Sequence, residues 1–487
     1  MTHATTQAVQ LHIGGRDRDA TDGRTFARSN PVHGEAVTVA AAAGVEDAVA
    51  AVEAASAAFP AWAVTSPAER RDLLLAAAVR LEGKADDFAA ATVAETGSPA
   101  HWAHFNVGLA ASMFREAAGL TTQSRGATIP SNVPGSLALA VRKPAGVVLG
   151  MAPWNAPVIL GVRALATPLA VGNTVVFKAS EKCPRIHRLI VDALVEAGLP
   201  DGVVNFVSHA PEDAAAVVEA MIAHPAVRRV NFTGSTPVGR IIGRLCGEHL
   251  TPSVLELGGK APFVVLDDAD VDAAVAAAAF GAYANSGQIC MSTERFIVDE
   301  RVADEFVQKL AAKASGLPVG DPGGQVVLGS VVDADTVERC NALLDDAVGA
   351  GAQVVAGGRA TTTLMPATLL DHVTPTMRIW REESFGPVKS VTRVDGVDAA
   401  VAAANDTEFG LSASVFGRDV ARALEVAGRI ESGICHVNGP TVHDEPQMPF
   451  GGVKASGWGR FGGLEGVHEF TDLQWTTVQQ GPRHYPF

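Results

Sequence analysis

Apolar residues recur with two different spacings in the central part of the chain. Short runs rich in Val, Leu and Phe, such as Ala145–Met151 and Asn173–Lys178, alternate with longer segments that show helical spacing, such as Pro157–Val171 and Pro184–Ala197. The short runs predict buried strands and the longer segments predict helices. This alternation is typical of βαβ units in a parallel sheet, which binds ligands beyond the carboxyl ends of its strands.

The same pattern predicts further elements on both sides of this region. Further strands are predicted at Gly202–Val207, Val227–Phe232, Val254–Leu257, Phe263–Leu266, Arg295–Val298 and Ser412–Phe416. Further helices are predicted at Val45–Phe59, Pro67–Leu81, Asp86–Glu95, Glu212–Ala223, Pro237–Glu248, Val271–Ala284, Val302–Ala314, Asp333–Ala350, Val397–Ala404 and Val420–Ile430. The second half of the chain is therefore a second α/β series.

Two segments do not follow this alternation. Thr121–Arg142 contains Thr, Ser and Pro and then alternates weakly, and Phe470–Val478 reads as a terminal strand. Two protruding strands would invite edge pairing with another chain. The alternative is a loop and a frayed tail.

Composition narrows the classes of partner. The 487 residues are 47% hydrophobic and 19% charged, with a formal net charge of −15. An acidic surface repels nucleic acid and anionic lipid, so neither is expected as a partner. The five cysteines are scattered, which predicts neither disulfides nor a metal site. No secretory signal is visible and Val271–Ala284 is too short to span a bilayer, so we expect a cytoplasmic protein.

A cysteine stands at the end of the segment Gly281–Cys290. Gly287 allows a sharp backbone turn and leaves room for a ligand. A nucleophilic cysteine needs partial access and a base or positive field nearby. The alternative is a small buried hydrophobic residue, which is the commoner role of a lone cysteine.

Two other polar residues lie at or just after the ends of predicted strands. Glu256 lies between two leucines before a Gly-Gly pair, and an apolar pocket would raise its pKa and make it a base near neutral pH. Asn155, in the sequence Pro-Trp-Asn, has an amide that would suit a developing oxyanion. The alternatives are a salt-bridged or solvated glutamate and a turn asparagine.

Three more segments carry residues suited to a nucleotide. Phe232–Gly239 follows a strand and opens a helix, whose first N–H groups suit a pyrophosphate. Lys178 and Glu181 lie at the carboxyl end of another predicted strand, where they would reach ribose hydroxyls unless they are surface charges. Glu382–Pro387 places a carboxylate and an aromatic ring near a Gly-Pro turn.

Together, in this order and spacing, these segments resemble the aldehyde dehydrogenase superfamily. The resemblance extends from about Leu11 to Trp475 and includes PWN, FTGS, ELGGK, the cysteine after Gly-Gln, E-x-FGP and Pro449–Gly457. Across Pro153–Leu169 the pattern looks like bacterial salicylaldehyde, benzaldehyde and vanillin dehydrogenases.

The resemblance implies an α/β fold of three parts. These are a Rossmann-like NAD-binding domain (1–120 and 145–256), an α/β catalytic domain (257–456), and a small β oligomerisation arm with the C-terminal tail (121–144 and 457–487). A homodimer or homotetramer is therefore expected, and the arm favours edge pairing over the loop-and-tail alternative.

The resemblance also implies the roles of the catalytic residues. Cys290 would attack the aldehyde carbon, and Asn155 with the Cys290 N–H would stabilise the oxyanion. Hydride transfer would leave a thioester, and Glu256 would activate the water that hydrolyses it. Lys178 is expected among both the catalytic and the cofactor-binding residues.

NAD is the expected cofactor. Glu181 near the ribose would repel a 2′-phosphate, although Lys178 softens this effect, so NADP is the weaker alternative. The expected cofactor contacts are Met151, Ala152, Pro153, Trp154, Lys178, Ser180, Glu181, Phe232, Gly234, Ser235, Gly239, Leu257, Gly258, Glu383 and Phe385.

The substrate pocket is expected to take an aromatic aldehyde. Ala156 and Ala284 are small where many family members have aromatic residues, and Arg163 would bind a phenolic or carboxylate oxygen. The expected pocket residues are Ala156, Arg163, Ala284, Ile289 and Phe450. The alternatives are that Arg163 pairs with a nearby acid and merely packs, and that the substrate is an aliphatic aldehyde or a semialdehyde.

Three rival functions are weighed against this one. A CoA-acylating enzyme usually lacks the glutamate found here as Glu256, and a non-catalytic family member would lack this residue or Cys290. A cysteine hydrolase would need a histidine beside the thiol, and no positional signature shows one. One departure from the family is Phe461, which stands where many members carry a glutamate of a proton path.

Overall fold

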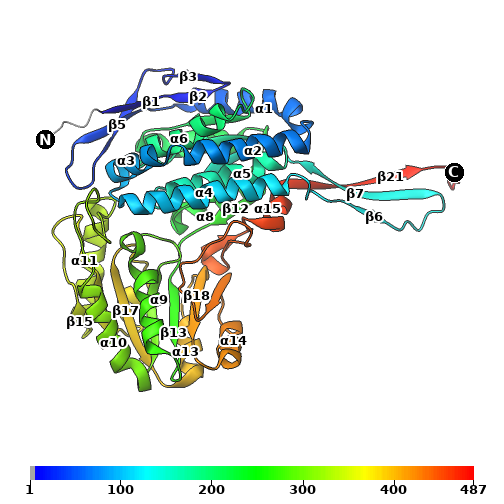
Figure 1. Ribbon diagram of the computed structural model, residues 1–487. Helices are drawn as coiled ribbons and strands as arrows, with labels where there is room; N and C mark the ends of the chain where they lie inside the picture. The colour runs from blue at the N-terminus through cyan, green and yellow to red at the C-terminus, as the bar shows by residue number, and fades with distance from the viewer. Residues whose placement is uncertain (1–5) are drawn as a thin grey trace.

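Two sheets of mainly parallel strands carry the helices on their faces (Figure 1). The structure, a computed structural model, describes residues 6–487. Both sheets have the α/β organisation that the alternating pattern predicted.

The first sheet has eight strands in the order β20-β12-β11-β8-β9-β10-β2-β3. Its parallel strands are β8 (Val147–Met151), β9 (Thr174–Lys178), β10 (Val204–Val207), β11 (Val227–Thr233) and β12 (Ser253–Glu256). Antiparallel strands at its edges are β2 (Leu11–Ile13), β3 (Arg16–Arg18) and β20 (Gly457–Trp458). A small sheet of β1 (Gln7–Val9), β5 (Ala36–Ala41) and β4 (Thr25–Ser29) lies beside it.

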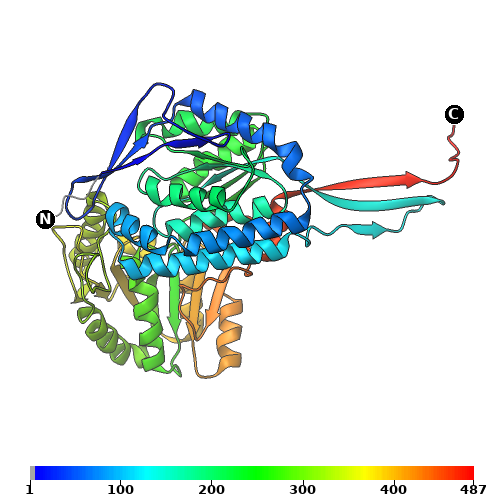
Figure 2. The same ribbon diagram turned by 45° about the horizontal axis from the view of Figure 1, so that its top comes forward.

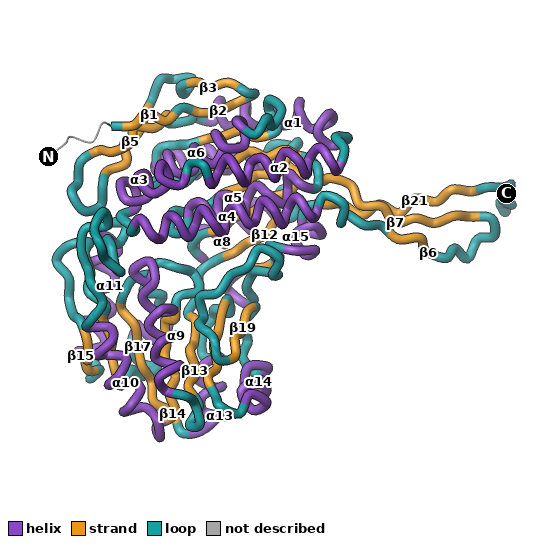
Figure 3. The backbone as a smooth tube through the Cα atoms, viewed as in Figure 1, coloured by secondary structure: helices purple, strands orange, loops and turns teal. Residues whose placement is uncertain are grey.

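Eight helices belong to this half of the described chain. They are α1 (Val45–Ala63), α2 (Pro67–Glu82), α3 (Ala85–Thr96), α4 (Ala100–Leu120), α5 (Pro157–Ala170), α6 (Pro184–Glu196), α7 (Ala214–Ala223) and α8 (Thr236–Glu248). In Figure 3, α2, α4 and α5 lie side by side, and α4 packs against both of the others. The helix α4 and the strands β1 to β5 were not predicted from the sequence.

The second sheet has seven strands in the order β15-β16-β17-β14-β13-β18-β19. Its strands are β13 (Ala261–Val265), β14 (Thr293–Asp299), β15 (Gln353–Ala356), β16 (Thr368–Asp371), β17 (Val388–Val394), β18 (Ser412–Phe416) and β19 (Ile434–Val437). Its helices are α9 (Val271–Tyr283), α10 (Glu300–Ser315), α11 (Ala334–Gly349), α12 (Arg378–Arg381), α13 (Gly396–Asn405) and α14 (Val420–Gly428).

A three-stranded arm projects from the body in both Figure 1 and Figure 2. It consists of β6 (Ala127–Ile129), β7 (Ser136–Pro144) and β21 (Thr471–Gln479), with β7 in the middle. The prediction of two protruding strands is confirmed, and the loop-and-tail alternative is wrong. The tail predicted at 457–487 divides, however, because β20 pairs with the first sheet and α15 (Gly463–Glu469) packs against α4, so only β21 belongs to the arm.

The two large sheets are joined at the carboxyl end of β12. This strand ends at Glu256, and β13 of the second sheet begins at Ala261. No helix within residues 6–487 has both the length and the apolar character that a bilayer crossing requires.

Candidate active site

A cleft of about 530 Å³ lies where the first sheet meets the second. The cleft is lined by segments at or after the ends of β8, β11 and β12, together with Cys290 and the loop before β17. Its lining includes Pro153, Trp154, Asn155, Thr233, Gly234, Ser235, Pro237, Glu256, Gly258, Cys290, Glu383 and Phe385. The cleft thus lies at the carboxyl ends of parallel strands, where an α/β sheet was expected to bind its ligand.

Two glycines allow the cleft walls to approach each other. A Cβ atom on Gly259 would lie 2.6 Å from the Cys290 carbonyl oxygen, and one on Gly258 would lie 3.0 Å from Oε2 of Glu383. The Gly259 N–H donates to Oε1 of Glu383 at 3.0 Å. Any side chain on this segment would therefore separate Cys290 and Glu383 from Glu256.

Glu256 is a buried carboxylic acid whose oxygens lack hydrogen-bond partners among residues 6–487. Burial raises its pKa to about 7, while the Arg163 guanidinium and the Cys290 thiol oppose this rise. An acid of this kind exchanges protons readily near neutral pH. The salt-bridged or solvated alternative for Glu256 is therefore wrong.

Cys290 is partly exposed and follows a strained turn. Asn285, Ser286 and Gly287 have φ values of 49°, 55° and 73°, all in the left-handed region. A Cβ on Gly287 would lie 2.3 Å from the Gly386 carbonyl oxygen, so only glycine fits there. Burial and the neighbouring Glu256 raise the pKa of the Cys290 thiol well above its usual range. The thiol therefore needs a base, and Glu256 is beside it.

Asn155 is fixed next to the backbone that leads to Cys290. Its Nδ2 donates to the Gln288 carbonyl oxygen at 3.0 Å. The main-chain carbonyl oxygen of Asn155 accepts from Trp102 Nε1 at 3.0 Å and from Asn285 Nδ2 at 2.9 Å. These contacts place an amide donor beside the cysteine, and they show positioning roles for Trp102 and Asn285 that sequence reasoning missed.

The N-terminus of α8 opens onto the cleft. Ser235 is the N-cap residue, but its side chain makes no capping hydrogen bond, and Pro237 occupies the first turn. The first N–H groups of this thirteen-residue helix are therefore without a side-chain cap. Such a helix start suits an anionic group such as a pyrophosphate.

Lys178 and Glu181 lie at the end of the neighbouring strand β9, outside the lining of the cleft. Burial lowers the pKa of Lys178, and the Glu181 carboxylate opposes that shift. Although burial opposes it, Lys178 lowers the pKa of Glu181. The two side chains thus form an oppositely charged pair on the same sheet edge as the cleft.

The loop with Glu383 and Phe385 is anchored by a buried carboxylate on β14. Glu294 Oε2 accepts from Ser384 N at 2.9 Å and from Lys260 Nζ at 2.7 Å, while Oε1 accepts from Lys389 Nζ at 2.7 Å. Although burial opposes it, the two ammonium groups lower the pKa of Glu294 to about 2. These contacts fix the loop that faces Gly258.

The expected aldehyde pocket is apolar. Ala156, Ile289 and Phe450 belong to one buried cluster, and Ala284 and Cys290 pack against it. Trp102 of α4 belongs to the same cluster. The predicted pocket residues other than Arg163 thus belong to or pack against the same apolar cluster as Cys290, and their role in binding the substrate stays a prediction.

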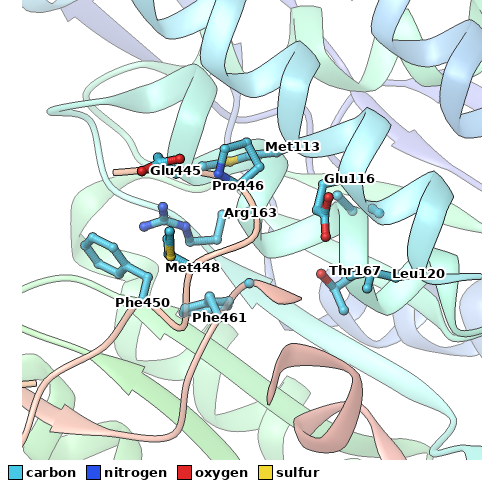
Figure 4. A pocket seen from close by; sticks show the side chains of 13 residues that line it. Met113, Glu116, Leu120, Arg163, Thr167, Glu445, Pro446, Met448, Phe450 and Phe461 are labelled. Atoms are coloured by element: carbon cyan, nitrogen blue, oxygen red, sulfur yellow. The ribbon is translucent and has the colours of Figure 1, made fainter. Parts of the chain in front are cut away.

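Arg163 was expected to bind an oxygen of the substrate, but its guanidinium already has a partner in the protein. Its guanidinium pairs with Asp444 and stacks over the Phe450 ring, 4.1 Å from its centre. The acid partner that we considered as an alternative is therefore present. Figure 4 shows Arg163 beside Phe450, Met448 and Phe461, at a small cavity of about 20 Å³.

Comparison with known proteins decides the family. The profile described as Aldehyde dehydrogenase family matches residues 18–476. The chain belongs to the aldehyde dehydrogenase family. It is similar to a vanillin dehydrogenase of Pseudomonas fluorescens (62% identical over 479 residues, 98% of this chain and 99% of the relative). A benzaldehyde dehydrogenase [NAD(+)] of Pseudomonas putida is 40% identical, over 94% of each chain.

A solved structure confirms the fold. The crystal structure of a salicylaldehyde dehydrogenase from Pseudomonas putida G7, complexed with salicylaldehyde, superimposes with a TM-score of 0.97 at 47% identity. The match covers 99% of this chain and 100% of that one. The predicted aldehyde dehydrogenase fold is therefore confirmed.

The close approach at Gly259 gives a testable consequence. Gly259→Ala should displace Cys290 and lower kcat/KM for any aldehyde substrate by about a hundredfold, since a misplacement of about 1 Å has an effect of that size. The matched control is Gly247→Ala, because a Cβ at Gly247 meets no atom within 4 Å. Steady-state kinetics on the two purified variants make the comparison. Equal activities would show that the Gly-Gly link tolerates a side chain.

Proposed function

We propose that this protein oxidises aromatic aldehydes to carboxylic acids with NAD. The observation that carries the proposal is the placement of Cys290, Asn155 and the unpaired Glu256 carboxyl in one cleft, with Cys290 packed against an apolar cluster. Relatives named vanillin and benzaldehyde dehydrogenase, matching nearly the whole chain, support an aromatic substrate.

The cleft fits a dinucleotide. It is lined by the uncapped start of α8, which suits the pyrophosphate, and by Glu383 and Phe385, and the missing Cβ of Gly258 leaves space beside Glu383. NAD, when bound, accepts the hydride that leaves the substrate carbon. The expected contacts of Met151, Ala152, Ser180, Phe232, Gly239 and Leu257 belong to this proposal.

The side chains at the end of β9 favour NAD over NADP. Lys178 and Glu181 would meet the adenosine ribose, where Glu181 repels a 2′-phosphate. The positive charge of Lys178 reduces this repulsion, so NADP is the weaker cofactor. Lys178 belongs to the cofactor site in this proposal, and its expected place among the catalytic residues stays a prediction.

The chemistry starts at the thiol. Glu256 takes the proton of Cys290, and the thiolate sulfur then forms a bond with the aldehyde carbon. The Asn155 amide and the Cys290 N–H donate to the oxyanion, each contributing about 3–4 kcal/mol of stabilisation. Collapse of this adduct with hydride loss leaves the acyl group on sulfur.

Hydrolysis of the thioester needs Glu256 again. After releasing its first proton to solvent, the carboxylate removes a proton from water, and the hydroxide oxygen attacks the acyl carbon. The Cys290 thiolate leaves and the acid is released. Because Phe461 is buried and apolar where many members carry a glutamate, that position takes no part in the proton exit.

The domain division follows the sheets. We propose that 1–120 and 145–256 bind NAD and that 257–456 carry the nucleophile. The arm would join copies of this chain, because Leu473 and Trp475 on β21 are 59% and 77% exposed. Exposed apolar side chains on an unpaired strand edge favour association.

The substrate proposal is tested by a panel of aldehydes. We expect kcat/KM for benzaldehyde, salicylaldehyde and vanillin to exceed that for hexanal by at least about tenfold, because the small residues Ala156 and Ala284 lie in or against an apolar cluster with aromatic rings. Cys290→Ala should abolish NADH formation with all four while NAD binding, followed by fluorescence titration, is kept. A preference for hexanal would end the aromatic proposal, and undiminished turnover by Cys290→Ala would end the mechanism.

The raised pKa of Glu256 predicts a pH dependence. Because the carboxylate form is the base, turnover should fall as pH decreases through about 7. Glu256→Gln should lower kcat by at least about a hundredfold and remove this acid limb. The control Glu408→Gln alters an exposed carboxylate and should keep the profile of the wild type. An unchanged acid limb in Glu256→Gln would assign it to another group.

The arm predicts an assembly. Leu473 and Trp475 lie on the same face of β21, so Leu473→Glu with Trp475→Glu should convert a dimer or tetramer into single chains. Gln474→Glu, on the opposite face, is the matched control. Light scattering gives the mass of each. A wild-type protein with the mass of one chain would contradict the proposal.

A further inference from the structure

Arg163 and Asp444 form a buried ion pair close to the expected aldehyde pocket. Their side chains are only 6% and 9% exposed. An Nη2 N–H of Arg163 donates to Oδ2 of Asp444. The guanidinium lies over the Phe450 ring, which closes its other side. Figure 4 shows Arg163 and Phe450 side by side.

One carboxylate oxygen of Asp444 is not used by this ion pair. Oδ1 of Asp444 is buried and has no hydrogen-bond partner among residues 6–487. A buried carboxylate oxygen without a donor is strongly disfavoured, so native proteins supply one from protein, water or ligand. Asp444 therefore has capacity for one more donor.

The pair lies close enough to the catalytic groups for the charge of Arg163 to act on both the Glu256 carboxyl and the Cys290 thiol. Arg163 lies two helical turns after Ala156 on α5, and hence on the same face of the helix. Its neighbour Phe450 shares the apolar cluster with Ala156 and Ile289, against which Cys290 packs. The charges of Arg163 and Asp444 both act on the Glu256 carboxyl. A ring held for attack by Cys290 would thus lie near both charged groups.

The charge balance of the pair distinguishes between substrates. Because Asp444 already neutralises Arg163, the pair offers no net positive charge to a carboxylate, and the free Oδ1 repels one. A hydroxyl group can instead donate to Oδ1 and accept from a second guanidinium N–H. The pair is therefore complementary to a neutral hydroxyl and not to an anion.

We propose that Asp444 selects aldehydes whose aromatic ring carries a protonated hydroxyl group, and that it disfavours aldehydes carrying a carboxylate. This inference rests on the proposed aromatic aldehyde dehydrogenase function and assigns its specificity to one oxygen atom. Asp444 acts on substrate binding and takes no part in the covalent steps.

The test compares ratios of kcat/KM within each variant, so that a general loss of activity cancels. The substrates are benzaldehyde, its three monohydroxy isomers and 4-formylbenzoate, at a pH where the phenols are protonated. In the wild type, the best hydroxy isomer should exceed benzaldehyde by about tenfold or more, the effect of one hydrogen bond to a charged group. The ratio of 4-formylbenzoate to benzaldehyde should be well below one.

Two variants separate the contributions. The double variant Arg163→Met with Asp444→Leu replaces a buried ion pair by apolar residues, a change that folded proteins tolerate. It should reduce the hydroxyl preference to within about twofold of unity. The single variant Asp444→Asn leaves Arg163 without its counter-charge, so its relative activity on 4-formylbenzoate should rise by about tenfold. The matched control Glu445→Gln changes the adjacent, exposed carboxylate and should keep both ratios.

The outcomes distinguish this inference from the proposed function. A wild-type preference for hexanal over every benzaldehyde overturns the aromatic function itself. A hydroxyl preference that is absent in the wild type, or that survives in the double variant, overturns only the role of Asp444. Failure of Asp444→Asn to gain activity on 4-formylbenzoate also counts against it, and circular dichroism of each variant verifies the fold.

Discussion

The site depends on one constraint: Gly258 and Gly259, which link β12 to β13, have no side chains. Glu256 ends the first sheet, and the Gly258–Gly259 link lets the Cys290 backbone and the Glu383 carboxyl lie against it. Catalytic groups from two separately formed sheets can meet only because this segment has no Cβ atoms. The strained turn at Asn285–Gly287 serves the same purpose from the other side, since it directs the chain toward the link.

Two buried carboxylates in this region have different pKa values and different roles because their neighbouring residues differ. Glu294 is flanked by Lys260 and Lys389 and has a pKa of about 2, so it stays charged and fixes a loop. Glu256 has no such partners, and burial raises its pKa to about 7. Equal burial therefore produces a permanent anchor in one place and an exchangeable proton site in the other.

Local pattern predicted much of this architecture and little of its long-range detail. The strands β8, β9 and β18 and the helices α5 and α6 follow from apolar spacing and from Pro and Gly at helix ends, and family motifs pointed to Cys290 and Glu256. The helix α4 was not predicted because Asn106, Gly108 and Gly119 weaken its helical pattern. In the folded protein, packing against α2 and α5 stabilises it. Contacts such as Trp102 with Asn155, or Arg163 with Asp444, join residues far apart in sequence, and no local spacing encodes them.

The order of strands in the arm has a consequence for biosynthesis. The strand β21 follows every other described element in the sequence, yet each of its nine residues pairs with β7, which the ribosome completes more than three hundred residues earlier. During translation one edge of β7 is therefore unpaired until β21 is synthesised, whereas the strands of both large sheets are synthesised before β21. A nascent chain can therefore complete the arm only after residues 471–479 have left the ribosome, by which time every strand of both large sheets has been synthesised.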